Sequence, residues 1–126
     1  MAAPQNLKYD ADQHLWIDID GDTATIGITD YAQNQLGELL FVELPDEDDD
    51  FERGDEFSVV ESGKKANGLE APFGFTIIES NEFLDDEPEA INEDAFENWI
   101  VRVKITDEDG IDDLVDADAY EAACAE

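Results

Sequence analysis

Apolar and polar residues alternate along several short runs, as expected for strands with one buried face. The runs HLWIDID (14–20) and TATIGI (23–28) flank Gly21-Asp22, a pair typical of a tight turn, and together they predict a hairpin. The run ELLFVEL (38–44) is predicted to be a buried strand that stops at the following proline. Further strands are predicted for three β-rich runs, at 56–62, 73–80 and 99–105.

Helical signals are short and lie between or after these runs. The segment DYAQNQLG (30–37) predicts a short helix with Asp30 as its N-cap, Gln33 in a capping box and Gly37 at its end. The polar segment 81–98 is rich in turn residues and has room for a short helical piece. Apolar residues recur at helical spacing after Gly110 and predict one or two terminal helices packed on the sheet, at Ile111, Leu114, Val115, Tyr120 and Ala123.

Many short strands separated by turns predict a mainly β fold, a small sandwich or flattened barrel. Short helices, including one at the C-terminus, complete it. The chain shows no tandem repeat and no linker, so residues 1–126 are expected to form a single domain.

The charge is extreme, with 36 acidic residues against 6 basic ones and a formal net charge of −30. Such self-repulsion opposes a compact state at ordinary salt, and at about 1 M salt the Debye length falls to roughly 3 Å and screens it. At 42% hydrophobic residues the chain can still build a core. We therefore expect a halophilic, acidic protein.

The composition also excludes some partners and locations. The sequence offers no basic patch that could neutralise phosphates, so nucleic acid is not an expected partner. No apolar run approaches the roughly 20 residues of a membrane helix, and no secretory signal opens the chain. A cytoplasmic protein without a membrane partner is the expectation.

Enzyme motifs are missing or weak. We find no nucleophile elbow, no P-loop and no G-x-G-x-x-G after a strand. The single histidine, His14, is predicted to be a surface or packing residue, and the single cysteine, Cys124, a small apolar residue of the terminal helix. The acidic run 46–50 lacks the spacing of a calcium loop, so no metal site is predicted.

Two of the four lysines, Lys64 and Lys65, lie side by side between β-rich runs. Gly63 before them suits a tight hairpin, and Gly68 with Pro72 indicates an irregular return. A turn of this kind would hold a lysine amine away from the sheet, where a modifying enzyme could acylate it. On position alone, two solvated loop lysines would be the simpler interpretation.

The wider pattern favours acylation. Glu61-Ser62-Gly63-Lys64 resembles a lipoyl-lysine hairpin, with an acidic residue three positions before the lysine. Four longer stretches, with LKY at 7–9, resemble the glycine cleavage system H-protein family over nearly the full length: GDTATIGITDYAQNQLGELLFVELP (21–45), ERGDEFSVVES (52–62), EAINED (89–94) and DADAYEA (116–122). ATIGITDYAQ followed by GELLFVELP is specific to this family and absent from lipoyl domains in general.

The resemblance implies a barrel-sandwich hybrid fold and a carrier protein that is not itself an enzyme. It implies covalent lipoate on Lys64, with Glu61, Ser62 and Gly63 forming the hairpin that the attaching enzyme recognises. That enzyme would be a lipoate ligase or a lipoyl/octanoyl transferase. The other implied partners are a glycine decarboxylase with pyridoxal phosphate, a tetrahydrofolate-dependent aminomethyltransferase and the flavoenzyme dihydrolipoamide dehydrogenase. The arm would carry the aminomethyl group of glycine between the first two.

Some residues depart from the family pattern. Gly68 replaces an aspartate, and Gln13 and Leu15 replace the serine and glutamate expected to contact the loaded amine. Losing such contacts weakens the hold on a charged amine. A neighbouring carboxylate, Asp12 or Glu70, could take their place.

These departures keep other functions open. One is an H-like lipoate-binding carrier for another pathway, such as heterodisulfide-reductase-like sulfur oxidation or lipoyl transfer. Another is a binding or scaffold protein without lipoate. A biotin carrier is disfavoured because Met1 is the only methionine, whereas methionines usually flank a biotinyl-lysine.

Overall fold

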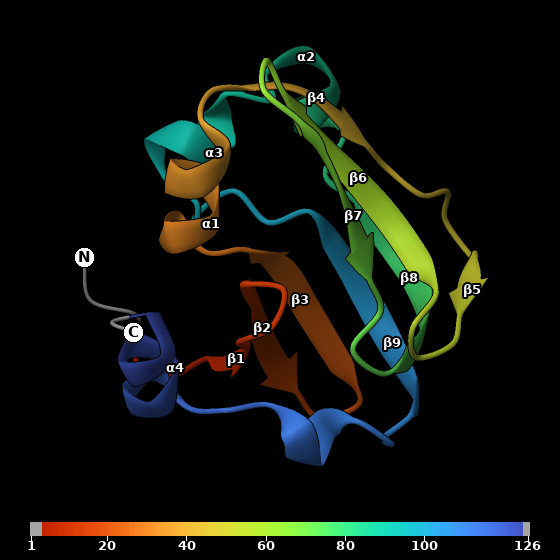
Figure 1. Ribbon diagram of the computed structural model, residues 1–126. Coiled ribbons are helices and arrows are strands. Elements are labelled where there is room, and N and C mark those ends of the chain that lie inside the picture. Colours follow the sequence, from red (N-terminus) through yellow and green to blue (C-terminus); the bar gives the residue numbers. More distant parts are fainter. Residues whose placement is uncertain (1–3, 125–126) are drawn as a thin grey trace.

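The computed structural model describes residues 4–124 and contains two antiparallel sheets with short helices (Figure 1). The larger sheet has the order β1-β2-β3-β9-β8-β5, and the smaller one has the order β4-β6-β7. The strands are β1 (Lys8–Asp10), β2 (Leu15–Asp20), β3 (Thr23–Ile28), β4 (Leu39–Glu43), β5 (Asp50–Phe51), β6 (Glu56–Ser62), β7 (Ala66–Glu70), β8 (Gly74–Ser80) and β9 (Val101–Asp107). The helices are α1 (Asp30–Leu36), α2 (Phe83–Asp86), α3 (Ala90–Glu93), a 3₁₀ turn (Ile111–Asp113) and α4 (Ala117–Cys124).

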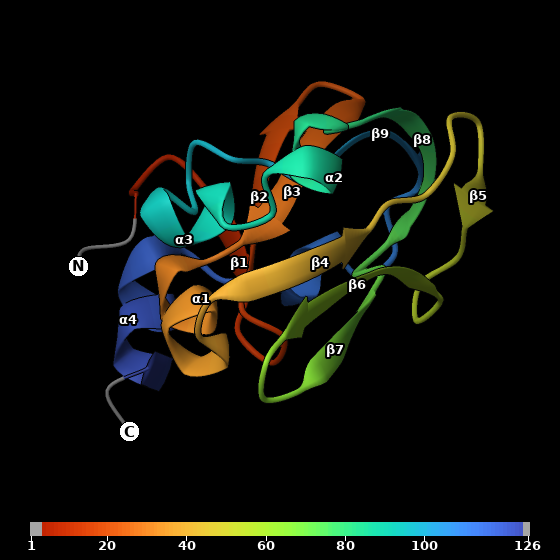
Figure 2. The same cartoon turned by 90° about the horizontal axis from the view of Figure 1, so that it is seen from above.

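The predicted β fold with short helices is confirmed. Figures 1 and 2 show α1, α3 and α4 gathered at one end of the molecule, beside the two sheets. The main core brings together buried side chains from both sheets, among them Ile17 and Val103 of the larger sheet and Val60 and Leu69 of the smaller one. The hairpin predicted for 14–28 is also confirmed, since Asp20 pairs with Thr23 across the turn.

A second, smaller cluster holds α4 in place. Tyr120 of α4 stacks on Tyr9 of β1 with ring centroids 4.7 Å apart and an interplanar angle of 8°. Ala117, Leu7 and Trp16 are buried in the same cluster. The prediction of one or two terminal helices is therefore confirmed by the 3₁₀ turn at Ile111–Asp113 and by α4, but not every residue of the pattern is helical. Leu114 and Val115 precede α4, and Val115 bridges Tyr9 in extended conformation.

Two local predictions were wrong at α1 and β4. The N-cap of α1 is Thr29, whose side chain accepts a hydrogen bond from Ala32 N at 3.2 Å, and Asp30 is the first helical residue instead. Threonine and aspartate both cap helices, so only the backbone conformation decides between neighbours. The strand predicted to be buried at 38–44 is β4, in which Leu40 and Phe41 are 61% and 48% exposed. The pairing of β4 with β6 shifts register between Leu39 and Phe41, so the alternation of buried and exposed side chains breaks at Leu40.

Candidate functional site

The turn between β6 and β7 carries both lysines and projects at the top of the view in Figure 1. Its ends are joined by a backbone hydrogen bond from Ser62 N to Lys65 O at 2.9 Å. The Ser62 hydroxyl braces the turn, because it accepts a bond from Lys64 N at 3.2 Å and donates to Lys65 O at 3.4 Å. Lys64 and Lys65 are exposed. A short, braced turn thus holds two amines in solvent.

The glycines of this hairpin do not act as predicted. Gly63 is not among the residues with positive φ, and a Cβ there would meet only Leu40 Cδ1, at 4.0 Å. The turn therefore does not require glycine at this position. Gly68 does not make the return irregular, because β7 runs from Ala66 to Glu70 and pairs with β6. The carboxylate of Glu56 occupies the space that a side chain at Gly68 would need.

The side chain of Lys64 lies beside the end of α1. Gly37 ends this helix with φ 85°, and its N–H bonds to Gln33 O at 2.9 Å, so the predicted helix end is confirmed. A Cβ at Gly37 would lie 3.7 Å from Lys64 Cε and 3.8 Å from Lys64 Nζ. The ion pairs found within residues 4–124 all involve Arg53 or Arg102. The Lys64 amine is therefore exposed and has no ion-pair partner in the described part of the chain.

A hollow of about 350 Å³ is lined by Lys65, the neighbour of Lys64 in the turn. Residues 12–14 of the β1–β2 loop line one side, α1 lines a second through Leu36, and β7 lines a third through Asn67. Leu36 and Lys65 are the chain neighbours of Gly37 and Lys64, so the hollow begins one residue along the chain from each of them. It has the charged and apolar lining that the end of a flexible arm on Lys64 could contact.

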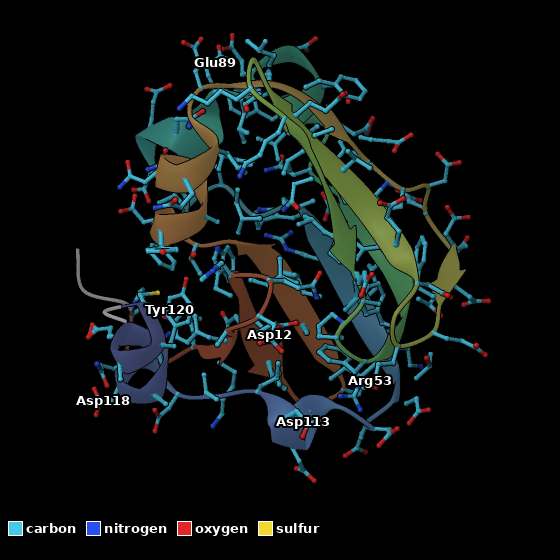
Figure 3. The ribbon with its side chains drawn as sticks, in the orientation of Figure 1. Asp12, Arg53, Glu89, Asp113, Asp118 and Tyr120 are labelled. Atoms are coloured by element: carbon cyan, nitrogen blue, oxygen red, sulfur yellow. The ribbon has the colours of Figure 1, made fainter. Side chains whose placement is uncertain are left out.

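Of the two carboxylates proposed from the sequence as replacements, the structure places one in this hollow. Asp12 lines it, and Figure 3 shows this residue on the β1–β2 loop near the centre of the view. Glu70 lines a neighbouring hollow of about 380 Å³ together with Arg53. Asp12 also lines that neighbouring hollow, and its backbone N donates to Asp10 Oδ1 at 3.1 Å, which fixes the backbone of the loop.

Gln13 fastens this loop to the lysine hairpin. Its Nε2 donates to Glu70 O at 2.9 Å, and its Oε1 accepts from Glu70 N at 2.7 Å. The same Nε2 donates to Asp10 Oδ2 at 2.8 Å. Gln13 is therefore a bridge between the β1–β2 loop and β7, the two walls of the hollow. The sequence marked Gln13 only as a lost serine, and nothing local to it indicates a bond to a residue 57 positions away.

His14 closes the loop in a strained conformation, with φ 63°. Its Nδ1 lies 2.9 Å from the Tyr120 hydroxyl, which also lies 2.6 Å from Thr29 Oγ1. The imidazole packs against the Tyr31 ring with centroids 4.6 Å apart, as the packing interpretation predicts. Burial lowers the pKa of His14, and the nearby aspartates offset this only in part. The imidazole is therefore neutral at pH 7.

No cluster of three or more metal-ligating side chains occurs within residues 4–124, and no helix in that part of the chain is long and apolar enough to cross a membrane.

A family model described as Glycine cleavage H-protein matches residues 7–126. The chain belongs to the glycine cleavage H-protein family. The resemblance drawn from the sequence is thereby confirmed.

Similar H proteins match 92–100% of this chain. Those of Staphylococcus carnosus and Clostridioides difficile are 47% and 53% identical over 127 and 117 residues. These matches cover 100% and 92% of this chain, and 100% and 93% of the relatives. A solved structure of the H protein from Mycobacterium marinum has a TM-score of 0.87 at 33% identity, covering 98% of this chain and all of that one. The barrel-sandwich fold class is thus confirmed, and nothing in these matches supports a carrier for another pathway.

Proposed function

We propose that this H-protein family member is the lipoyl carrier of glycine cleavage and that Lys64 is its attachment residue. The observation that carries this proposal is the position of Lys64 at the tip of the β6–β7 hairpin, exposed, without an ion pair among the described residues and three residues after Glu61 of β6. Lys65 is equally exposed, so the spacing from Glu61 is what favours Lys64. An enzyme that acylates an amine must reach it without unfolding the domain. Lys64 meets this condition.

The attaching enzyme, a lipoate ligase or a lipoyl/octanoyl transferase, would recognise the hairpin by shape. Ser62 supports this recognition by bracing the turn through its hydroxyl. Glu61 pairs with Ala66 in β7 and places a carboxylate three residues before the lysine. Gly63 contributes its backbone to the recognised turn, although the turn does not require glycine at this position.

The residues next to Lys64 fit a long covalent arm. The missing side chain at Gly37 leaves room beside Lys64 Cε and Nζ, and the 350 Å³ hollow opens one residue further on. When attached, the lipoyl group would supply a disulfide, one sulfur of which could carry the aminomethyl group between the partners. This chain contributes the tether, which raises the concentration of the bound group at each partner. Catalysis belongs to the partners, namely the pyridoxal phosphate decarboxylase, the folate-dependent aminomethyltransferase and dihydrolipoamide dehydrogenase. The proposed location of the carrier is the cytoplasm.

Intact-mass analysis tests the attachment residue. We expect one lipoyl addition when the protein is produced with lipoate and a ligase, lost in Lys64→Ala and retained in Lys65→Ala. The two variants are matched, since both remove one exposed lysine of the same turn. Addition to Lys65 alone, or none with folded protein by circular dichroism, would contradict the proposal.

A second experiment tests the pathway. Lipoylated protein should support glycine–bicarbonate exchange by a glycine decarboxylase, and the Lys64→Ala protein should not. If dihydrolipoamide dehydrogenase reduces the arm but no exchange occurs, the carrier serves other chemistry.

A further inference from the structure

The hollow beside Lys64 contains one carboxylate and one ammonium group. Among its lining residues the ionisable side chains that are charged at pH 7 are Asp12 and Lys65. His14 is neutral there because burial lowers its pKa. Neither charged group forms an ion pair or a side-chain hydrogen bond in the described part of the chain. Two opposite charges therefore face the same small space, and both remain available to a ligand.

These two charges come from separate elements, and hydrogen bonds fix each element so that the charges do not easily approach one another. Asp12 lies in the β1–β2 loop, whose backbone is fixed by Asp10 and whose neighbour Gln13 is bonded to β7. Lys65 lies in the turn braced by Ser62. A flexible ligand can approach both groups, while neither group has to leave its element.

Resting on the proposed function, we infer that Lys65 competes with the cationic end of the loaded arm for Asp12, so that the charge of this lysine sets how tightly the hollow holds an amine. Lys65 is thus a specificity-determining residue for the group that the arm carries. It weakens retention of a cation and leaves a neutral arm unaffected.

The effect has a defined salt dependence. Two like charges at a partly exposed site several ångströms apart change a binding equilibrium by about fivefold at low salt. At about 1 M salt, with a Debye length of roughly 3 Å, most of this difference disappears. A steric effect of the lysine chain would persist at all salt concentrations, which separates the two causes.

The test uses lipoylated protein in a Cys124→Ala background, so that the arm carries the only thiols. Both thiols of the reduced arm are alkylated with 2-bromoethylamine, each forming a C–S bond with release of bromide and a proton, so that the arm ends in two stable cationic groups. Alkylation with iodoacetamide gives a neutral arm of similar length. The docked fraction is measured from the NMR shifts of the Asn67 and Gly68 amides, which line the hollow.

We expect Lys65→Ala to raise the docking constant of the aminoethyl arm about fivefold at low salt and Asp12→Asn to lower it by a similar factor. Neither substitution should change docking of the neutral arm. Glu70→Gln removes a carboxylate that lines the neighbouring hollow and serves as the matched control, with no effect expected.

Several results would overturn the inference. One is a docking constant of the cationic arm that does not change in Lys65→Ala or in Asp12→Asn, and another is an equal change for the neutral arm. An effect that survives molar salt, a loss of docking in the control variant, or the absence of any amide shift in all the proteins would also overturn it. The mass measured before alkylation distinguishes a different failure. If Lys64 accepts no lipoyl group, the proposed function itself is refuted, and the inference falls with it.

Discussion

Replacing Gln13 with alanine should loosen the hollow without touching the lysine turn. The substitution removes three hydrogen bonds, two to the backbone of Glu70 at 2.7 and 2.9 Å and one to Asp10 at 2.8 Å. Each is worth about 0.5–1.5 kcal/mol net, and the partly exposed groups left behind regain water. We expect the free energy of unfolding to fall by about 2 kcal/mol. For a chain of this length that corresponds to a Tm roughly 5–10 °C lower.

Thermal and urea unfolding followed by circular dichroism, at one fixed salt concentration, would measure this loss. Gln35→Ala is the matched control, because Gln35 lines the same hollow from α1 but its side chain forms no hydrogen bond within residues 4–124. It should change stability by less than about 0.5 kcal/mol. Gln13→Glu keeps an acceptor for Glu70 N but loses both donated bonds and adds charge beside Asp10, so it should destabilise at least as much as alanine.

The reasoning is refuted if Gln13→Ala and Gln35→Ala unfold at the same denaturant concentration. A loss for Gln13→Ala accompanied by an unchanged Gln13→Glu protein would also contradict it, since the donated bonds would then carry no weight.

Four further predictions follow from the structure and the charge. Tyr120→Phe removes the hydroxyl that contacts Thr29 Oγ1 and His14 Nδ1 and should destabilise by about 1–2 kcal/mol in urea unfolding; a neutral result would show that water replaces it. Burial lowers the pKa of His14, so below pH 6.5 the unfolded chain binds more protons than the folded one, and the free energy of unfolding should rise with pH up to about 6.5. His14→Asn tolerates the positive φ and should remove that rise in a pH series. Gly63→Val should fold and accept lipoate, as measured by intact mass, because its Cβ meets only Leu40 Cδ1 at 4.0 Å; loss of addition would show that the backbone needs glycine. Stability by circular dichroism should increase toward molar salt as the net charge of −30 is screened, and equal stability in dilute buffer would count against a halophilic protein.

Local pattern was enough to predict the elements whose own residues specify them. The hairpin at 14–28 and the strand β9 alternate clearly, and Gly37 ends α1 as expected. The strand β7 was missed, because only Leu69 in it is buried and its extended form depends on pairing with β6. The exposure of Leu40 was missed for a similar reason, since an apolar run does not reveal where the pairing of its strand shifts register.

The sequence by itself determined the family, the mainly β fold, the pair of lysines before a β-rich return and the extreme negative charge. These properties depend on residue types and short spacings, which are visible along the chain. Only the tertiary structure decided that Asp12 and Lys65 face one hollow, that Gln13 bonds to Glu70, and that His14 meets Tyr120 across 106 positions. Such contacts are set by packing of the whole domain, in which one polar side chain has many compatible partners and only the folded geometry selects among them.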